Sequence, residues 1–215
     1  ADYIVLCNEK YVSKVTEIYG VPQERVRFVD MWRRFPKYTE PRYSRRALFF
    51  GRMNPYKGVD NLLEIAKKCP EIQFDVVGRV DPQVQELVDE LKKLPNVMMN
   101  NGYVTDEEMA KAFIKADWIV LPYYSATQSG VVIDGYRFGR PCIAFSVGAI
   151  AEQVCEGVSG YLIPEGNNAA FADKLRGAVC MSEGEYKKMS QNAYEYGVKK
   201  YSAEGAIGRF MKLIS

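Results

Sequence analysis

The chain has 215 residues, of which 47% are hydrophobic and 26% charged, a balance typical of a folded globular protein. Lysine and arginine total 29 against 27 acidic residues, so the net charge of +2 gives no reason to expect nucleic acid as a partner. No apolar run reaches membrane-spanning length, and no basic stretch followed by an apolar one opens the sequence. We therefore expect a cytoplasmic protein.

Histidine is absent and the five cysteines are scattered without a Cys-x-x-Cys pair. The lack of histidine excludes a Ser-His-Asp or Cys-His mechanism within these residues. The odd, dispersed cysteines argue against a zinc site or a disulfide framework, and the sequence has no Asp-x-Asp metal pair. We expect neither a metal nor a cofactor, so any chemistry here uses carboxylates, arginine, lysine and backbone dipoles.

The first part of the chain has short elements and a long connector. Residues 3–6 and 26–29 have the apolar character of strands. Between them, Val12, Val15 and Tyr19 recur at helical spacing. Residues 31–46 are polar, aromatic and basic, which predicts a surface connector without a site.

From residue 47 onward, strand patterns and helix patterns alternate. Strands are predicted at 47–50, 72–77, 96–99, 118–121, 142–145 and 161–163. Helices are predicted at 59–66, 84–91, 105–116, 131–138, 148–154, from 168 onward, at 182–200 and at 204–213. Alternation of this kind is the signature of parallel βαβ units, so we predict an α/β fold with a doubly wound parallel sheet, Rossmann-like in type.

The segment 117–152 has a strand closed by Pro122, a polar loop at 123–130, the helix 131–138 and a second strand. A helix start offers unpaired N–H groups and partial positive charge, so residues 127–132 are suited to an anion such as phosphate. The alternative is that Ser129 and Gly130 form an ordinary helix cap in an ordinary loop.

Cations follow two of the predicted strands directly. Gly51-Arg52 and Gly78-Arg79 stand at strand ends, and Lys57 precedes the next helix. Ligands of doubly wound sheets bind at the carboxyl ends of the strands. These cations, together with the loop N–H groups, favour a diphosphate-bearing ligand, although solvated surface charge is the ordinary alternative for each.

Several motifs resemble family four retaining glycosyltransferases, which have the two-domain GT-B architecture. Residues 49–59 read FFGRMNPYKGV and are similar to that family's glycine-arginine and lysine-glycine stretch. Residues 139–144, GRPCIA, resemble its glycine-x-proline strand entry. The segments 148–152 and 157–164 resemble the part that closes the donor site. The resemblance covers most of the chain from 47 to about 175.

The resemblance implies a set of site residues. Arg52 and Lys57 match the positions that bind the donor diphosphate, and they are the expected catalytic residues. The family carries two glutamates near the donor, and counting back from Gly139 places them on Ala126 and Asp134. Asp134 would hold the ribose, whereas the first glutamate is missing. The expected donor-binding residues are Gly51, Thr127, Gln128, Ser129, Gly130, Val131, Asp134, Arg79 and Tyr103.

The resemblance also implies a division into three parts. Residues 1–46 would be the end of an acceptor domain and a connector, 47–181 the nucleotide-sugar-binding domain, and 182–215 carboxy-terminal helices that pack back on the fold. A missing amino-terminal domain would then bind the acceptor, a glycan or a lipid-linked sugar, with peripheral membrane contact at the cytoplasmic face. This chain alone would be inactive.

The function implied is transfer of a hexose from a nucleoside diphosphate sugar to an acceptor hydroxyl with retention, in cell-surface glycan or polysaccharide synthesis. With Ala126 at the first glutamate position, the chain offers no carboxylate nucleophile, which favours front-face attack. The alternatives are a nucleotide-sugar epimerase, an inverting transferase of the same architecture, or a non-catalytic sugar-nucleotide-binding module. A dehydrogenase is disfavoured because no G-x-G-x-x-G follows the early strands.

Overall fold

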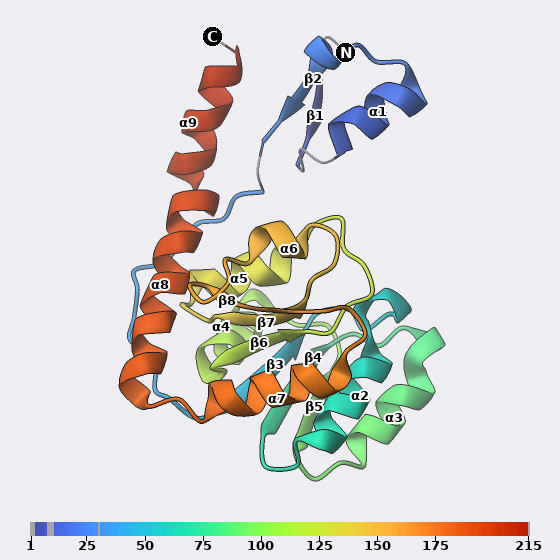
Figure 1. The fold of residues 1–215 in the computed structure, drawn as a ribbon, viewed down its shortest axis with the longest axis vertical. Coiled ribbons are helices and arrows are strands. Elements are labelled where there is room, and N and C mark those ends of the chain that lie inside the picture. The colour runs from blue at the N-terminus through green and yellow to red at the C-terminus, as the bar shows by residue number, and fades with distance from the viewer. Residues whose placement is uncertain (1–2, 8–10, 30, 215) are drawn as a thin grey trace.

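A six-stranded parallel sheet forms the centre of the computed structural model, which describes residues 3–7, 11–29 and 31–214, the last segment without the side chains of 209, 210 and 212–214 (Figure 1). The strand order is β5-β4-β3-β6-β7-β8. Their bounds are β3 Arg46–Phe50, β4 Gln73–Gly78, β5 Val97–Asn101, β6 Trp118–Leu121, β7 Cys142–Phe145 and β8 Gly160–Ile163. The predicted doubly wound parallel sheet is therefore confirmed.

Helices cover both faces of this sheet. Those between the strands are α2 Val59–Lys68, α3 Gln85–Lys92, α4 Asp106–Lys115, α5 Gly130–Arg137 and α6 Ile150–Gln153, and α7 Asn168–Val179 follows β8. Right-handed crossovers place the helices of the two halves on opposite faces, because the strand order reverses direction at β3. In agreement, α2 contacts α3 and α7, whereas α5 packs on a later helix, α8 Glu183–Tyr201.

The apolar runs in the sequence are explained by strands whose two faces are both buried under helices. Every residue of β6 and β7 is buried, since helices cover both faces of these inner strands. The largest fully buried side chains include Trp118 on β6, Phe145 on β7 and Phe49 on β3. A continuous core of this kind fixes the carboxyl ends of the strands in place, and the loops that follow them inherit that rigidity.

Most predicted bounds hold within two residues, and the differences have local causes. The helix predicted at 84–91 begins as a 3-10 turn, η4 Pro82–Val84, capped by the Asp81 side chain, before α3 proper. A second short 3-10 turn, η3 Pro55–Lys57, precedes α2. The cap at Asp81 and the proline in the first turn were predicted, but single turns leave little periodicity in a sequence, so the 3-10 form of neither turn was predicted.

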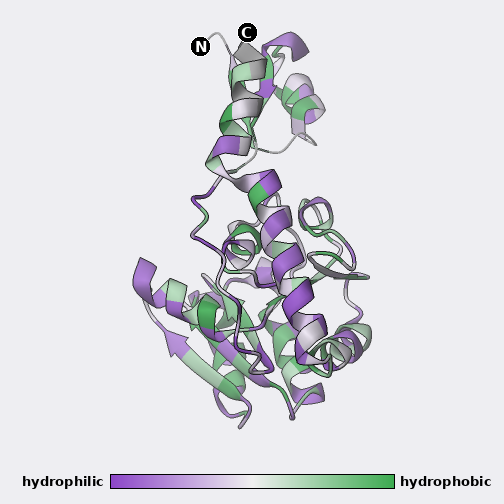
Figure 2. Ribbon diagram, turned by 90° about the vertical axis from the view of Figure 1, so that its left-hand side faces the viewer, coloured by the Kyte–Doolittle hydropathy of each residue, from purple (hydrophilic) through white to green (hydrophobic). Residues whose placement is uncertain are grey.

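The chain ends form a separate small unit and a long helical arm. β1 Ile4–Leu6 pairs in parallel with β2 Val26–Phe28, and α1 Val12–Tyr19 and the turn η2 Gln23–Arg25 lie between them. In Figure 1 this unit stands apart from the main sheet, and α9 Ala203–Ile214 extends from α8 to its level. Hydrophilic and hydrophobic residues alternate along this arm in Figure 2.

The predicted connector 31–46 is extended and joins that small unit to β3. It is held along α8: the Tyr194 hydroxyl donates to Pro36 O at 2.7 Å, and the hydroxyls of Tyr38 and Ser190 lie 3.1 Å apart. At its end, Ser44 N and Arg46 N donate to the buried Asp117 carboxylate. Side chains of α8 and β6 therefore fix the connector in place.

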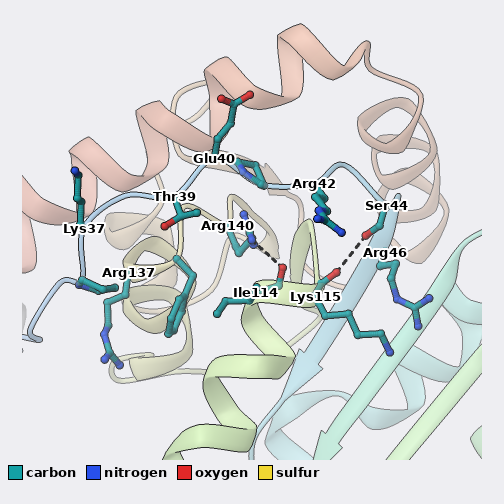
Figure 3. Close-up of a pocket in the computed structure, with 13 residues that line it drawn as sticks. Lys37, Thr39, Glu40, Arg42, Ser44, Arg46, Ile114, Lys115, Arg137 and Arg140 are labelled. Atoms are coloured by element: carbon teal, nitrogen blue, oxygen red, sulfur yellow. Dashed lines mark hydrogen bonds between the residues drawn. The ribbon is translucent and has the colours of Figure 1, made fainter.

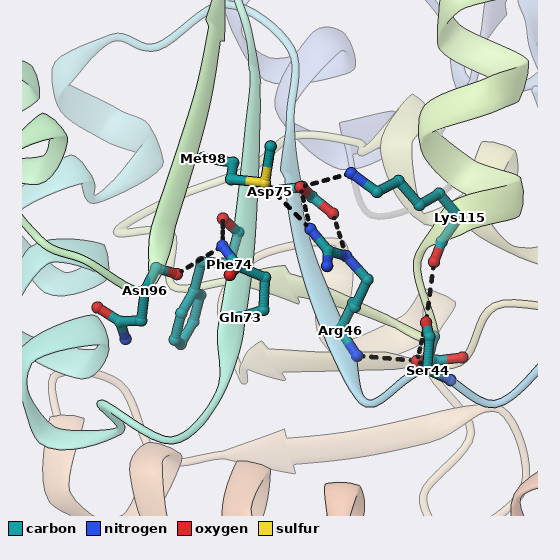
Figure 4. A network of polar contacts seen from close by, with 9 residues as sticks. Ser44, Arg46, Gln73, Phe74, Asp75, Asn96, Met98 and Lys115 are labelled. Carbon is teal, nitrogen blue, oxygen red and sulfur yellow. Dashed lines mark hydrogen bonds and ion pairs between the residues drawn. The ribbon is translucent and has the colours of Figure 1, made fainter.

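At the start of β3, polar contacts bind three elements together (Figure 4). The Arg46 guanidinium donates twice to the Asp75 carboxylate of β4, both at 2.8 Å, and Lys115 of α4 reaches the same carboxylate at 3.3 Å. The bond with Asp75 raises the pKa of Arg46. Because the pairing is bidentate and largely buried, it helps to hold the register of β3 against β4.

Candidate functional site

The carboxyl ends of β3 and β6 lie side by side at the point where the strand order reverses, which is where ligands of doubly wound sheets bind. Gly51 follows β3 with φ +100°, a conformation that favours glycine, and a Cβ there would lie 2.7 Å from the Lys57 ammonium nitrogen. The glycine therefore makes room for Lys57.

Lys57 is buried at this point, with 8% of its surface exposed. Its ammonium nitrogen lies 3.4 Å from Phe50 O and 5.3 Å from the centre of the Tyr123 ring. It forms no ion pair with any residue in the described part of the chain. Burial lowers the pKa of Lys57 from 10.5 to about 8. A buried ammonium group without an ion pair would be stabilised by an anion bound next to it.

The strand ends approach each other closely beside Lys57. Gly58 has φ +64°, and a Cβ there would lie 1.9 Å from Pro122 O, so no other residue fits. The Asn61 amide of α2 donates to the same carbonyl at 3.0 Å. These contacts lock the loop after β6 against the start of α2, next to Lys57.

Unlike Lys57, Arg52 is mostly exposed and pairs with a carboxylate. Its guanidinium pairs with the Asp81 carboxylate at 2.7 Å, and 61% of the Arg52 side chain is exposed. The Arg52 contact and the backbone N–H of Gln83 lower the pKa of Asp81. Exposed pairs are worth little, so an anionic ligand can draw Arg52 away at small cost.

The start of α5 is held by one side chain from α6. The Gln153 amide accepts from Ser129 N at 2.9 Å and donates to Ser129 O at 3.1 Å. Ser129 is the N-cap of α5, yet its hydroxyl makes no capping bond and is buried without a hydrogen-bond partner among the described residues. Gln153 therefore fixes the backbone of the cap, while the hydroxyl remains available to a ligand.

The rest of the loop after β6 is tied to its surroundings through backbone groups. Ala126 O accepts from Ala149 N at 2.9 Å, which joins this loop to the one after β7. The Gln128 amide donates to Cys7 O of the small amino-terminal unit at 3.1 Å. Thr127 is exposed beside it, and Gly130 and Val131 form the first turn of α5.

Asp134 lies one turn further along α5 and is 9% exposed. One carboxylate oxygen accepts from Arg33 at 3.2 Å and from Arg137 at 3.0 Å. Arg33 comes from the connector, which was predicted to carry no site residue, and it contacts a residue predicted to bind the donor. The two arginines hold the carboxylate in place at the side of α5.

The structure brings most of the predicted site residues together but leaves two further out. Gly51, Lys57 and the segment 127–131 lie at the ends of the neighbouring strands β3 and β6. Arg79 follows β4 and is exposed, and Tyr103 follows β5 with 92% of its surface exposed. Tyr103 is two strands from β3, roughly 10 Å across the sheet.

Sequence reasoning missed four residues of this region. They are Gln153, Arg33, Arg137 and Tyr123, each of which holds or faces a predicted site residue. Tyr123 alone had a signal in the sequence, because it directly follows the buried strand. The others meet their partners only through the tertiary fold.

Comparison with known proteins decides the family. A profile described as "Glycosyl transferases group 1" matches residues 44–180, which include the whole sheet and every predicted site residue. The chain belongs to the group 1 glycosyl transferases. The resemblance to family four glycosyltransferases read from the motifs is therefore confirmed.

Curated relatives of this glycosyltransferase chain are 27% to 30% identical to it over the segments that align. It is 27% identical to D-inositol 3-phosphate glycosyltransferase of Mycolicibacterium smegmatis over 63% of the chain and 32% of that protein. It is 30% identical to phosphatidyl-myo-inositol mannosyltransferase of Mycobacterium leprae, over 63% of the chain and 37% of that protein. An uncharacterized glycosyltransferase of Methanocaldococcus jannaschii is 28% identical over 79% of the chain and 47% of that protein. The chain thus spans less than half the length of each.

Solved structures confirm the predicted GT-B type of fold. Anabaena HepE in complex with UDP has a TM-score of 0.84 at 15% identity, covering 100% of this chain and 64% of that one. Sucrose-phosphate synthase of Thermosynechococcus elongatus has a TM-score of 0.83 at 19% identity, covering 100% and 58%. At these sequence identities, the similarity shows a shared fold and nothing about function. Within the described residues, no helix is both long and apolar enough to cross a membrane.

Proposed function

We propose that this chain forms the donor-binding part of a retaining glycosyltransferase that takes a sugar from a nucleoside diphosphate sugar. The observation that carries the proposal is Lys57, a buried cation without an ion pair in the described residues, at the switch point of the sheet. Gly51 and the first turn of α5 lie next to Lys57. A diphosphate is the ligand whose charge these groups would complement best.

The chemistry follows from where charge develops. When the bond between the sugar and the diphosphate breaks, negative charge builds on the diphosphate oxygens. Lys57 and the N–H groups at the start of α5 would stabilise that charge in a site with little water, and Arg52 would join them after leaving Asp81. This role needs neither a metal nor a cofactor.

Asp134 would bind the ribose hydroxyls of the donor. Its second carboxylate oxygen makes no hydrogen bond with the described residues, whereas the first is held by Arg33 and Arg137. A carboxylate oriented in this way accepts hydrogen bonds from a diol without any change in its own position. The buried Ser129 hydroxyl would bind the phosphate or the sugar.

Front-face attack is the mechanism we propose for the transfer. A double displacement needs a carboxylate near the anomeric carbon, and the position of the family's first glutamate holds Ala126. In the front-face route, the departing phosphate accepts the proton of the attacking hydroxyl, so retention follows without a protein nucleophile. Because Ala126 replaces the first glutamate of the family, a non-catalytic module that binds a sugar nucleotide is the second candidate function.

The acceptor would be bound outside this chain, which spans less than half of its curated relatives. Those relatives carry names that point to inositol-containing acceptors, and HepE was solved with UDP and UDP-glucose. We propose a glycan or a lipid-linked sugar as acceptor, in the synthesis of surface polysaccharide at the cytoplasmic face of the membrane. UDP is the first nucleotide to test.

Isothermal titration with UDP, GDP and ADP tests the donor site directly. We expect saturable binding of one nucleotide without added metal, and loss of that binding in the Arg52→Ala, Lys57→Ala double variant. The Lys67→Ala, Lys68→Ala variant is the matched control, because it removes two exposed cations from the far end of α2. Equal weakening in both variants, or no binding by the whole protein, would refute the proposal.

Transfer assays on the full-length protein separate the two candidates. Release of UDP from a UDP-sugar in the presence of acceptor, with the anomeric configuration of the product read by NMR, would establish a retaining transferase. Tight nucleotide binding with neither transfer nor hydrolysis would establish the binding module instead.

A further inference from the structure

A cavity of about 640 Å³ lies at the amino edge of the sheet, beneath the connector (Figure 3). Six cations line it, namely Lys37, Arg42, Arg46, Lys115, Arg137 and Arg140. Glu40 is the one carboxylate among the lining residues, and it pairs outward with Lys187 of α8. The cavity is therefore strongly positive.

Arg140 lies between the two ends of this cavity, under the connector and beside the end of α4. It is 2% exposed, and two of its nitrogens donate at 2.9 Å to the carbonyls of Phe113 and Ile114. Its third nitrogen is buried without a partner, and no ion pair of Arg140 occurs in the described residues. The buried Asp117 carboxylate acts on the Arg140 charge from beyond ion-pair distance and Tyr186 lies nearby, so the charge is partly compensated, whereas one N–H of the guanidinium is left to donate to a ligand.

The other cations divide into paired and unpaired ones. Arg46 and Lys115 share Asp75, and Arg137 pairs with Asp134. Lys37 and Arg42, both exposed on the connector, have no ion pair with any described residue. Three cations, including Arg140, are thus left to attract an anion.

The walls of the cavity are apolar. Pro36 and Pro41 of the connector face Ile114 and Phe138, and Ile114 is 57% exposed. A volume of a few hundred cubic ångströms with apolar walls and a few convergent charges is typical of a site for an organic molecule. An inorganic ion would leave most of this surface without contact.

This cavity is separate from the phosphate-binding end of the donor site, although Arg137 lines the cavity and also pairs with Asp134. Arg46 begins β3 and Arg140 stands before β7, whereas Gly51 and Lys57 follow the other end of β3. Opposite ends of a strand of this length are roughly 15 Å apart. A ligand in the cavity is therefore not the sugar donor of the proposed function.

We propose that the cavity binds a phosphate monoester or diester that carries an apolar group, with its phosphate at Arg42, Lys37 and Arg140 and its apolar part against Ile114 and Phe138. Such a group can belong to a soluble alkyl phosphate or to the headgroup region of an anionic lipid. The chemistry recognised is the same in both cases.

Titration with hexyl phosphate tests this site in the Arg52→Ala, Lys57→Ala chain, whose donor site no longer binds phosphate. We expect one hexyl phosphate per chain, bound more tightly than inorganic phosphate. Lys37→Gln with Arg42→Gln should weaken it about tenfold, since two cations are lost. Both side chains are exposed, so the fold is retained, which circular dichroism verifies. Lys67→Gln with Lys68→Gln is the control of equal charge and should leave binding unchanged.

Sedimentation with phosphatidylcholine vesicles, with and without phosphatidylglycerol, identifies the source of the phosphate. Binding that needs phosphatidylglycerol and falls in the Lys37→Gln, Arg42→Gln variant assigns a lipid, and binding of hexyl phosphate alone assigns a soluble ester. Absence of binding to both probes overturns the proposal. So does equal weakening by the control variant, or binding of inorganic phosphate as tight as that of hexyl phosphate.

Discussion

Lys57 is a residue whose burial costs the folded chain stability. Its ammonium group is buried beside Phe50 O and the Tyr123 ring without a carboxylate in the described residues, and burial lowers its pKa to about 8. In the unfolded chain the pKa returns to about 10.5. The folded state therefore carries the cost of a desolvated charge at neutral pH.

Lys57→Met should stabilise the ligand-free chain by roughly 2 kcal/mol at pH 7 while it abolishes nucleotide binding. Between pH 8 and 10.5 the unfolded chain binds more protons than the folded one at this site, so the wild type gains stability and the difference shrinks. Urea unfolding of both chains at pH 7 and pH 10 measures the difference between their free energies of unfolding. Other titrating groups affect both chains equally, so their effects cancel in that difference. Lys67→Met, an exposed control, should change little; a Lys57→Met chain no more stable than wild type at pH 7 would contradict the expectation.

Nucleotide affinity should fall as the pH rises through about 8. A bound diphosphate favours the protonated Lys57, so full affinity is present below the folded pKa of about 8 and is lost above it, by up to about tenfold per pH unit. Titrations of UDP from pH 6.5 to 9.5 in buffers of different ionisation heat would detect the accompanying proton uptake. A flat profile would rule out Lys57 as the group that meets the phosphate.

At the scale of the element, the start of α5 depends on a residue from α6. Gln153 holds both the N–H and the carbonyl of Ser129, which is 4% exposed. A helix end buried without partners is costly, so this one side chain decides whether the first turn of α5 stays aligned with Lys57.

Gln153→Ala should cost about 1–3 kcal/mol of stability, because two buried backbone groups lose their partners. We also expect UDP affinity to fall about tenfold, since the donors of the helix start are no longer held in place. Gln191→Ala, which removes an exposed contact with Glu195 on α8, is the matched control. Lower stability with unchanged UDP affinity would show that the clamp is structural only.

At the scale of the whole molecule, α8 belongs to the core of the sheet domain. Tyr186 is fully buried and its hydroxyl donates to Asp117 O at 2.9 Å, directly before β6. Gly197 packs on Tyr136 of α5, and Tyr201 stacks on the same ring. By contrast, α9 extends beyond the sheet toward the small amino-terminal unit (Figure 1).

Removal of residues 203–215 should therefore leave cooperative unfolding in place, with a loss of about 1 kcal/mol because the buried Ala206 is removed. Removal of 183–215 should abolish it, because Trp118 and Tyr136 lose their cover. Thermal unfolding followed by near-ultraviolet circular dichroism distinguishes the two. Cooperative unfolding of the shorter chain would mean that the sheet domain ends before α8.

Much of the fold followed from local patterns. The strands 118–121 and 142–145 were predicted to the residue, because brief apolar runs closed by proline or glycine have few other uses. The capping boxes at Thr105 with Glu108 and at Ser182 with Glu185 are both present. Each of these features depends on only a few neighbouring residues, so it can be predicted from the sequence alone.

The sequence alone therefore determined the alternation of elements, the parallel sheet and the cluster of cations and small residues at its carboxyl edge. Only the tertiary structure decided that Asp134 meets Arg33, that Gln153 holds Ser129 and that Arg52 turns to Asp81. It also decided that Arg140, without an ion pair among the described residues, lies at a basic cavity. These contacts join residues from 24 to 101 positions apart. The crossovers between strands set which of them meet, and no local pattern records that choice.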